Sequence, residues 1–394
     1  MSADRYLYYD DEKFDLYDFG PGHYFSPLRQ RLTTDLLEKA GLLPETAVTR
    51  AVPATVEELL LFHTPEYIAV IRADGQTPNG PVQRWGIGTS DNPLFRRMHE
   101  AAALRVGATL AAARQVIEGR AIHAVNFAGG LHHAHPSKAS GFCIYNDIAV
   151  AIAWLRREYD LRVAYVDLDA HHGDGVQWGF YDDPNVLTIS IHESGRYLFP
   201  GTGEPHELGD GPARGTKVNI PLLPHTGPKS WLECFELVVP AVLEAFRPDI
   251  LITQHGCDAH RYDPLTHLAI STQSMEAAAR RLHELAHELC DGRWIALGGG
   301  GYSIWDVVPR AWAAVWAVVT DQALPPAVPE TWRKAWAQRV PGRDLPDEWH
   351  DLIEELPPKD GEDIENEWRH AQNRRVAKEV LETVTRLLRA GVRS

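Results

Sequence analysis

The sequence has few cysteines, no basic run and no long uninterrupted apolar stretch. Four of its 394 residues are cysteine and none forms a C-x-x-C pair, which excludes a disulfide scaffold and favours a reducing compartment. Thirty-nine Lys and Arg stand against 54 Asp and Glu, giving a net charge of −15. An acidic chain repels phosphate backbones, so we expect no nucleic-acid partner. Arginine interrupts the apolar stretches at 101–117 and 307–319, so we also expect no membrane span.

The remaining composition is that of an ordinary globular chain. Apolar residues make up 44% and charged residues 24%, which excludes a mostly disordered or collagen-like protein. Residues 1–15 are rich in tyrosine and acid and lack the basic-then-apolar pattern of a signal peptide. These features predict a cytoplasmic protein.

Short β-branched runs alternate with longer helical patterns. We expect strands at 124–127, 162–166, 186–191, 250–254 and 294–297, and helices at 101–118, 148–157, 231–246 and 274–290. Strands that are apolar throughout and separated by helices are typical of a parallel sheet covered on both faces. The prediction is therefore a single-domain α/β fold.

The pattern changes beyond about residue 325. Residues 344–367 hold eleven carboxylates and one lysine. Apolar residues of a helix beginning near Asn366 share one face at spacings of three and four: Val376, Val380, Val384, Leu387 and Leu388. We expect a main domain over 1–325, and over 326–394 an acidic segment and C-terminal helix packed on it or appended to it. A helix that binds a partner is the alternative.

Polar residues collect where four predicted strands end. The strand at 124–127 is followed by His132 and His133, that at 162–166 by Asp167, Asp169, His171 and Asp174, that at 250–254 by Asp258, and that at 294–297 by four glycines and Tyr302. Ligands of parallel α/β sheets bind beyond the carboxyl ends of the strands. The pattern predicts a functional site at this edge. The alternative for any one segment is a hydrogen-bonded loop that closes its strand.

Asp169, His171 and Asp258 are the predicted metal ligands. Side chains alternate along a strand, so Asp167, Asp169 and His171 are expected on one side. Asp169 and His171 can then chelate one divalent ion, with Asp258 as the third ligand. Two Asp, one His and an open position are typical of a catalytic zinc site. Such an oxygen-rich set also accepts Fe²⁺ or Co²⁺.

A metal held by two carboxylates needs a separate general base, because the carboxylates neutralise its charge. His132 and His133 can supply that base. Asp167 and Asp174 can hold the two imidazoles in fixed tautomers. For either histidine alone, a buried structural role is the alternative.

Tyr302 follows the glycine run at 298–301. Glycines permit positive φ and close backbone approach, so the phenol can be aimed at a metal-bound carbonyl, where it would stabilise an oxyanion. A tight loop with an exposed tyrosine is the alternative. The run lacks the G-x-G-x-x-G spacing of a dinucleotide site.

These segments together resemble the zinc-dependent, histone-deacetylase-like family of the arginase–deacetylase superfamily. The resemblance covers roughly residues 15 to 315. It rests on Gly22-His23 and on the segments 62–67, 91–93, 129–133, 140–143, 146–147, 165–175, 199–203 and 297–302. The segment 254–268 is most similar to the bacterial acetoin-utilisation deacetylases.

The resemblance implies an arginase–deacetylase fold of about eight strands. It also implies zinc-dependent hydrolysis of N-ε-acetyl-lysine in proteins to lysine and acetate, with metal-bound water attacking the amide carbonyl. The residues assigned above to metal, histidine pair, carboxylate partners and tyrosine coincide with the family's catalytic residues. An acetylated protein substrate such as acetyl-CoA synthetase is the implied partner.

The resemblance adds residues that bind substrate or a second ion. Those implied for substrate are Asp91 at the rim, Phe142 and Phe199 on the walls of an acyl-lysine channel, Gly141, Gly300, and Arg29 in an internal pocket. A structural potassium ion is implied near Asp167, Asp169, His171 and Ser190.

The departures from the superfamily are also informative. Arginase-type enzymes bind a second manganese ion through carboxylates at positions held here by Gly173 and Gly256, which argues against a ureohydrolase. An acetylpolyamine amidohydrolase is the main alternative, followed by a deacylase for other acyl-lysines. A non-catalytic acyl-lysine-binding protein would lack a ligand or the tyrosine, and neither is missing. The sequence assigns no role to His255 or His260, and does not divide acid from base between His132 and His133.

Overall fold

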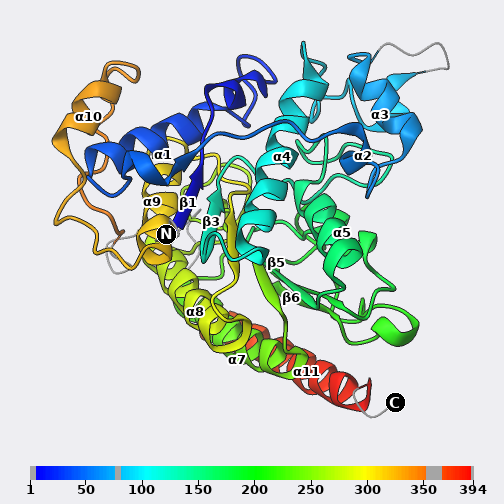
Figure 1. Cartoon of the computed structure of the whole chain (residues 1–394). Coiled ribbons are helices and arrows are strands. Elements are labelled where there is room, and N and C mark those ends of the chain that lie inside the picture. Colours follow the sequence, from blue (N-terminus) through cyan, green and yellow to red (C-terminus); the bar gives the residue numbers. More distant parts are fainter. Residues whose placement is uncertain (1–5, 76–80, 352–365, 392–394) are drawn as a thin grey trace.

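A computed structural model describes residues 6–75, 81–351 and 366–391 (Figure 1). Its strands form one sheet in the order β2-β1-β3-β8-β7-β4-β5-β6, and every neighbouring pair is parallel. The strands are β1 (Tyr6–Tyr9), β2 (Val48–Thr49), β3 (His123–Asn126), β4 (Val163–Asp167), β5 (Val186–Glu193), β6 (Lys217–Leu222), β7 (Ile250–Gln254) and β8 (Trp294–Leu297). The predicted α/β fold with about eight parallel strands is confirmed.

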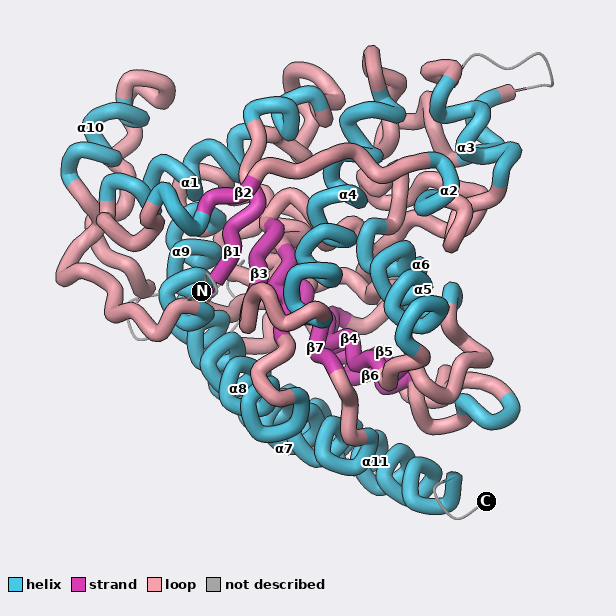
Figure 2. The backbone as a smooth tube through the Cα atoms, viewed as in Figure 1, coloured by secondary structure: helices cyan, strands magenta, loops and turns pink. Residues whose placement is uncertain are grey.

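Helices cover both faces of the sheet (Figure 2). They are α1 (Leu28–Lys39), α2 (Val56–Leu59), α3 (Pro65–Arg72), α4 (Met98–Ile117), α5 (Asp147–Tyr159), α6 (Asp174–Gly179), α7 (Pro228–Phe246), α8 (Thr272–Cys290), α9 (Val308–Val319), α10 (Glu330–Ala337) and α11 (Glu367–Gly391). One face packs against α4 and α5, and the other against α7, α8 and α9.

Alternate residues of each central strand enter two separate cores. In β4, Val163 and Tyr165 pack into the core with α4 and α5, whereas Ala164 and Val166 pack into the core with α7 and α8. Because both sets of side chains are buried, residues 163–166 are apolar without interruption, and only the last residue of the strand, Asp167, is charged. This is the physical basis of the uninterrupted apolar runs in the sequence.

Three strands were not predicted, and all lie toward the sheet's edges. Strand β2 has only two residues, β1 is a run of tyrosines and one leucine beside acidic residues, and β6 contains Asn219 and Pro221. Proline is tolerated in an edge strand, where one side of the backbone needs no partner. Each of these strands therefore lacks the pattern that identifies a buried central strand.

Helix α11 lies along α7 and β6 (Figure 1). Ala377, Val380 and Val384 are buried against this surface. The Asn373 side chain, 1% exposed, accepts a hydrogen bond from the Leu223 backbone N–H and donates to hydroxyls of Thr226 and Ser230. The helix is thus joined to the sheet by polar and apolar contacts. Residues 352–365 of the predicted acidic segment lie outside the described residues.

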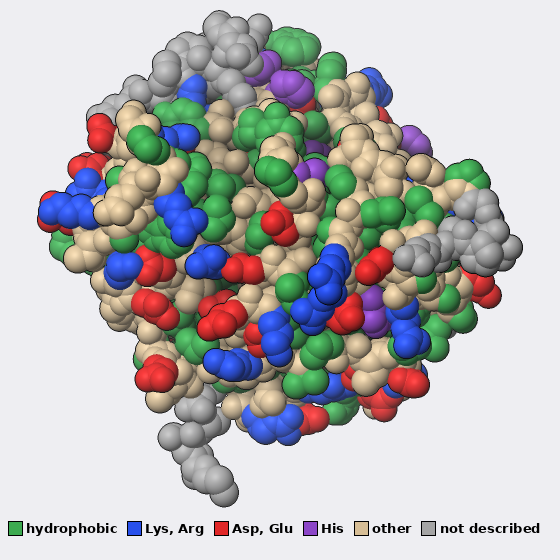
Figure 3. All heavy atoms as spheres, turned by 90° about the horizontal axis from the view of Figure 1, so that it is seen from above, with side chains coloured by type: hydrophobic (Ala, Val, Ile, Leu, Met, Phe, Trp, Pro, Cys, Tyr) green, Lys and Arg blue, Asp and Glu red, His purple; other side chains and the backbone are tan. Residues whose placement is uncertain are grey.

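Two features of the structure concern possible partners: the distribution of charge on the surface and the apolar character of the helices. On the face seen in Figure 3, acidic and basic side chains are interspersed rather than separated by sign. Within the described ranges, no helix has the length and apolar character needed to cross a membrane.

We expect Asn373→Ala to lower the free energy of unfolding by about 1–3 kcal/mol, because it leaves buried polar groups without partners. Chemical denaturation measures the loss. The control is Arg375→Ala on the same helix, whose side chain is 61% exposed and should matter by less than about 0.5 kcal/mol. Equal losses in the two variants would contradict the docking of α11 through Asn373.

Candidate active site

The predicted site residues converge at the carboxyl ends of β3, β8, β7 and β4, which are neighbours in the middle of the sheet. The loop after β3 carries the histidine pair, β4 ends at Asp167, the loop after β7 carries Asp258, and the loop after β8 carries Tyr302. Adjacent parallel strands therefore deliver four distant segments of the chain to one place.

Asp169, His171 and Asp258 form a compact cluster of possible metal ligands. The His171 Nδ1 atom lies 3.1 Å from Asp169 Oδ1 and 2.9 Å from Asp258 Oδ2. The three residues are 1%, 8% and 0% exposed. Two oxygen donors and one nitrogen donor thus face one another in an almost closed space.

A turn, rather than an extended strand, aligns these ligands. Strand β4 ends at Asp167, so the expected alternation along a strand does not explain the position of Asp169 and His171. Instead, Asp167 Oδ1 accepts a hydrogen bond from the Asp169 N–H, and Asp169 Oδ1 accepts one from the His171 N–H. Each carboxylate holds the backbone two residues ahead, a local bond typical of aspartate.

The remaining carboxylate oxygens are bound by amide groups. Asp169 Oδ2 accepts hydrogen bonds from the Gln254 side chain at 2.6 Å and from the Gly300 N–H at 2.7 Å. Asp258 Oδ1 accepts one from the Ala170 N–H at 2.8 Å. These bonds fix both carboxylates in place. Neither Gln254 nor Ala170 was among the predicted site residues.

The cluster fits a divalent cation. Burial and the charge of Asp169 raise the pKa of Asp258 to about 6. Burial alone lowers the pKa of His171, but its hydrogen bonds to the two carboxylates raise that pKa well above the ordinary value. Both effects reflect an excess of negative charge in a buried space. A divalent ion with oxygen and nitrogen ligands supplies the missing positive charge.

Glycines leave the space that these carboxylates occupy. A Cβ atom added at Gly173, Gly256 or Gly300 would collide with a carboxylate oxygen of Asp167, Asp169 or Asp258, respectively. Gly173 and Gly256, at the positions compared above with manganese ligands of arginase-type enzymes, therefore make room for the carboxylates of Asp167 and Asp169. Gly300 acts on the cluster both by its small size and by its N–H group.

The two tandem histidines each pair with a buried carboxylate. His132 Nδ1 lies 2.8 Å from Asp167 Oδ2, and His133 Nδ1 lies 2.7 Å from Asp174 Oδ1. Each Nδ1–H can donate to its carboxylate, which leaves Nε2 free for chemistry. The Nε2 atom of His132 lies 3.9 Å from Asp169 Oδ2. The two carboxylates expected to hold the imidazoles thus each pair with one of them.

The surroundings shift the pKa values of the two histidines in opposite directions. Burial lowers the pKa of His133 to about 4, and the neighbouring His132 lowers it too, against the hydrogen bond to Asp174. For His132 burial acts in the same direction, but the charges of Asp167 and Asp169 outweigh it and raise the pKa to about 9. At neutral pH His133 is therefore the neutral member of the pair, as a general base must be.

Asn146 and Asp147 hold the loop that carries the histidines. The buried Asp147 carboxylate accepts hydrogen bonds from the Gly130 and Leu131 N–H groups at 3.1 and 2.8 Å. The Asn146 side chain donates to the Ala134 carbonyl at 3.0 Å and also caps α5. The sequence reasoning gave neither residue a role. A helix that begins with Asn-Asp before an apolar run was the available signal.

Tyr302 is held at both ends of its loop. Its backbone N–H donates to Asp263 Oδ2 at 2.7 Å. The Arg29 guanidinium, 4% exposed, donates to the Gly299 carbonyl at 2.8 Å and to the Gly301 carbonyl at 3.2 Å. Arg29 therefore fixes the glycine run that positions the phenol.

Two aromatic rings flank the approach to the cluster. The Phe142 ring lies edge-on to Tyr302, with centroids 5.7 Å apart, and the Phe199 ring lies edge-on to His133 at 5.1 Å. A Cβ at Gly141 would collide with the His133 ring and come within 3.0 Å of Phe199. The residues predicted to line a channel are thus placed against the catalytic candidates.

Asp91 is exposed at the outer end of this arrangement. The His23 ring connects it to the aromatic wall: His23 Nε2 lies 3.2 Å from the Asp91 carbonyl oxygen, and its ring centroid lies 4.7 Å from that of Phe142. Asp91 is therefore exposed to solvent, and its backbone is joined through His23 to the Phe142 ring.

Ser190 lies beside Asp167, because the two are register partners in β5 and β4. The Ser190 hydroxyl is 2.8 Å from His192 Nδ1. Together with Asp169 and His171, these residues remain the predicted surroundings of a potassium ion.

His255 and His260 have structural contacts. His255 Nε2 lies 2.7 Å from the Thr253 hydroxyl, and burial lowers the pKa of His255 to about 3. His260 Nε2 lies 2.8 Å from Asp351 Oδ2, and the Arg310 guanidinium donates to the other oxygen of Asp351. The loop after β7 is thereby joined to the segment that follows α10.

We expect Asp258→Ala to remove about one bound divalent ion per chain, because it deletes one of three ligands. Elemental analysis of the purified chain measures the loss. The control is Asp91→Ala, which removes an exposed carboxylate and should leave the metal content unchanged. Full metal content in the Asp258→Ala chain would show that Asp258 is not the third ligand.

Comparisons with known proteins identify the family of this chain. A model of the histone deacetylase domain matches residues 23–319. The acetoin utilization protein AcuC of Bacillus subtilis is 46% identical over 347 residues, covering 88% of this chain and 89% of the relative. That of Staphylococcus aureus is 41% identical over 356 residues, covering 90% and 91%.

Solved structures of HDAC homologs are also similar to this chain. The crystal structure of an HDAC homolog complexed with SAHA has a TM-score of 0.81 and 29% identity, over 95% of this chain and 99% of that one. The crystal structure of an HDAC homolog from Aquifex aeolicus has the same TM-score and identity, over 97% and 100%. The chain is an amidohydrolase of the arginase–deacetylase fold and belongs to the histone deacetylase family.

Proposed function

We propose that this chain hydrolyses N-ε-acetyl-lysine in proteins to lysine and acetate in a zinc-dependent reaction. The observation that carries the proposal is the juxtaposition of Asp169, His171 and Asp258 with the tandem histidines. Ligands for one divalent ion, a neutral imidazole and a phenol then surround the same point, as metal-assisted amide hydrolysis requires.

Zinc bound to the three ligands would polarise the amide carbonyl and lower the pKa of a water molecule. His133 Nε2 takes a proton from the attacking water while Asp174 holds its Nδ1–H. The new C–O bond gives a tetrahedral species, and the C–N bond breaks as the lysine amine receives a proton. His132, kept positively charged beside Asp167, stabilises the developing negative charge and can supply that proton.

Tyr302 stabilises the oxyanion. Burial and the charges of Asp258 and Asp169 raise the pKa of Tyr302 well above its ordinary value, so its hydroxyl is protonated and can donate a hydrogen bond. A donor held in place before the reaction stabilises the charge that develops in the transition state. Arg29 acts through Tyr302, because it holds the carbonyls on either side of Gly300.

We expect Tyr302→Phe to lower kcat by roughly 10²–10³-fold, the usual loss for one oxyanion donor. Metal content and the free energy of unfolding should stay at wild-type values. The control is Tyr24→Phe, since Tyr24 is 53% exposed and its ring lies 6.5 Å from that of Tyr302. Deacetylation of an acetyl-lysine peptide measures both. Unchanged turnover in Tyr302→Phe would remove the phenol from the mechanism.

The channel residues support a lysine side chain as the group that enters. Phe142 and Phe199 offer apolar faces that can bury the four methylenes of lysine without a polar partner. Asp91 can accept hydrogen bonds from the backbone N–H groups of a peptide, which a free polyamine does not offer. Because the relatives are acetoin utilization proteins, we propose an acetylated metabolic enzyme such as acetyl-CoA synthetase as the natural substrate.

We expect acetyl-lysine peptides to be hydrolysed with higher kcat/KM than acetylputrescine, and short acyl groups to be preferred over long ones. Asp91→Ala should lower kcat/KM for the peptide by roughly tenfold, the loss of one charge-assisted contact. Acetylputrescine turnover should not change. One enzyme preparation assayed against acetyl-, butyryl- and longer acyl-lysine peptides and acetylputrescine provides the comparison.

Asp182→Ala is the matched control. Asp182 is an exposed carboxylate just before β5 begins, at the amino end of that strand and thus away from the carboxyl ends that carry the candidate site. A preference for acetylputrescine would favour an acetylpolyamine amidohydrolase. Faster turnover of a long acyl-lysine would favour a deacylase of a different acyl group.

A further inference from the structure

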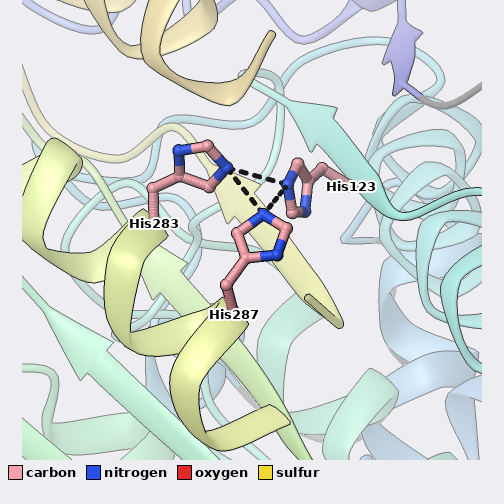
Figure 4. A group of neighbouring side chains, drawn as sticks. All are labelled: His123, His283 and His287. Atoms are coloured by element: carbon pink, nitrogen blue, oxygen red, sulfur yellow. Dashed lines mark hydrogen bonds between the residues drawn. The ribbon is translucent and has the colours of Figure 1, made fainter. Parts of the chain in front are cut away.

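A second cluster of histidines lies at the amino ends of the strands, opposite the carboxyl ends that carry the candidate active site. His123 is the first residue of β3, whereas the tandem histidines follow the last. His283 and His287 come from α8, which packs beside this end of the strand (Figure 4). The three rings point their Nε2 atoms toward one another.

The spacing of these nitrogens fits a shared metal ion. Nε2 of His123 lies 3.0 Å from that of His283 and 3.2 Å from that of His287, and the last two are 3.0 Å apart. Tetrahedral zinc with Zn–N distances near 2.0–2.1 Å holds its nitrogens about 3.3 Å apart. The three atoms therefore surround a point at ligand distance from each.

Hydrogen bonds alone do not satisfy this triangle. An imidazole nitrogen carries either one proton or one lone pair, and each points in a single direction in the ring plane. A closed ring of three hydrogen bonds would need every Nε2 to donate and accept at once. One proton can serve one pair, and the third nitrogen then has no partner in the triangle. A cation at the centre accepts all three lone pairs.

The sequence of α8 carries the matching motif. Residues 283–287 read H-E-L-A-H, and two histidines four residues apart on a helix lie on one face. H-E-x-x-H on a helix is a zinc-binding pattern. His123 supplies the third nitrogen from a segment 160 residues away.

Neighbouring rings hold the imidazoles in this orientation. The His123 ring stacks on Tyr6 at 5.6 Å, and the His283 ring stacks on Trp294 at 5.4 Å. The Asp321 carboxylate lies 3.7 Å from His283 Nδ1, where it can orient that ring as carboxylates do behind metal-bound histidines. His123 and His283 are buried and His287 is exposed, so an ion can enter from solvent.

We propose that His123, His283 and His287 bind a zinc ion that connects α8 to the first residue of β3. Three imidazole nitrogens and an open position facing solvent suit Zn²⁺ better than a hard cation such as Mg²⁺ or Ca²⁺. The role is structural. The glutamate of the motif, Glu284, accepts a hydrogen bond from Arg281 at 3.0 Å and is not assigned to any reaction.

Zinc binding to the full-length chain tests this site. The chain is stripped with a chelator, reloaded with zinc alone, desalted and analysed for zinc per chain. We expect about two ions in the wild type and about one in His287→Asn, in His283→Asn and in Asp258→Ala. Asp258→Ala combined with His287→Asn should bind none. The control is His206→Asn, which removes an exposed histidine outside the cluster and should keep both ions.

Thermal unfolding gives a second measurement. Zinc should raise the unfolding midpoint of Asp258→Ala but not that of the double variant, because only the former retains the histidine site. With chelator present, the two midpoints should coincide, which shows that His287→Asn does not damage the fold. The proposal is overturned if His287→Asn and His283→Asn bind as much zinc as the wild type, or if Asp258→Ala binds none.

Discussion

Buried carboxylates at and beyond the carboxyl ends of β4 and β7 impose the main physical constraint on this structure. Asp167, Asp169, Asp174 and Asp258 are between 0% and 5% exposed, and burying a charged carboxylate is costly unless it is hydrogen-bonded and paired. Backbone amides, the Gln254 side chain and the imidazoles supply those partners. The loops must therefore approach within hydrogen-bond distance, which explains both the glycines beside the cluster and the way the four central strands meet there.

The sequence was sufficient to predict the centre of the fold but not its edges. The runs 163–166 in β4 and 250–252 in β7 are uninterrupted apolar residues because two cores receive alternate side chains, and this pattern is visible without a structure. Strand β6, with Asn219 and Pro221, and the two-residue β2 are the outermost strands of the described sheet, so each pairs with a neighbour on one side only. Their residues are selected less strongly for apolar character, so composition did not identify them as strands.

The sequence was sufficient to predict those parts of the candidate site in which two side chains contact each other. The pairs His132–Asp167 and His133–Asp174 were found because both members are chemically distinctive and follow strand ends. Asp147 was not assigned a role, because its targets are backbone N–H groups 16 and 17 residues earlier in the chain, and almost any residue can provide such a group. His123 was missed for another reason. It is the first residue of β3, and ligands are not expected at the amino ends of parallel strands. Only the folded chain brings it to α8.

The glycines at 173 and 256 would make the candidate metal-ligand cluster hard to convert into a two-ion site by mutation. A side chain at either position, including the aspartate that a second ion would need, would collide with Asp167 or Asp169. Asp167 is also bonded to Tyr165 and His132, and Asp169 to Gln254 and Gly300. A single substitution toward a two-ion site would disturb the candidate ligands of the first ion before it created a site for the second. Conversion of a one-ion site into the two-ion site of arginase-type enzymes would therefore require several coordinated changes.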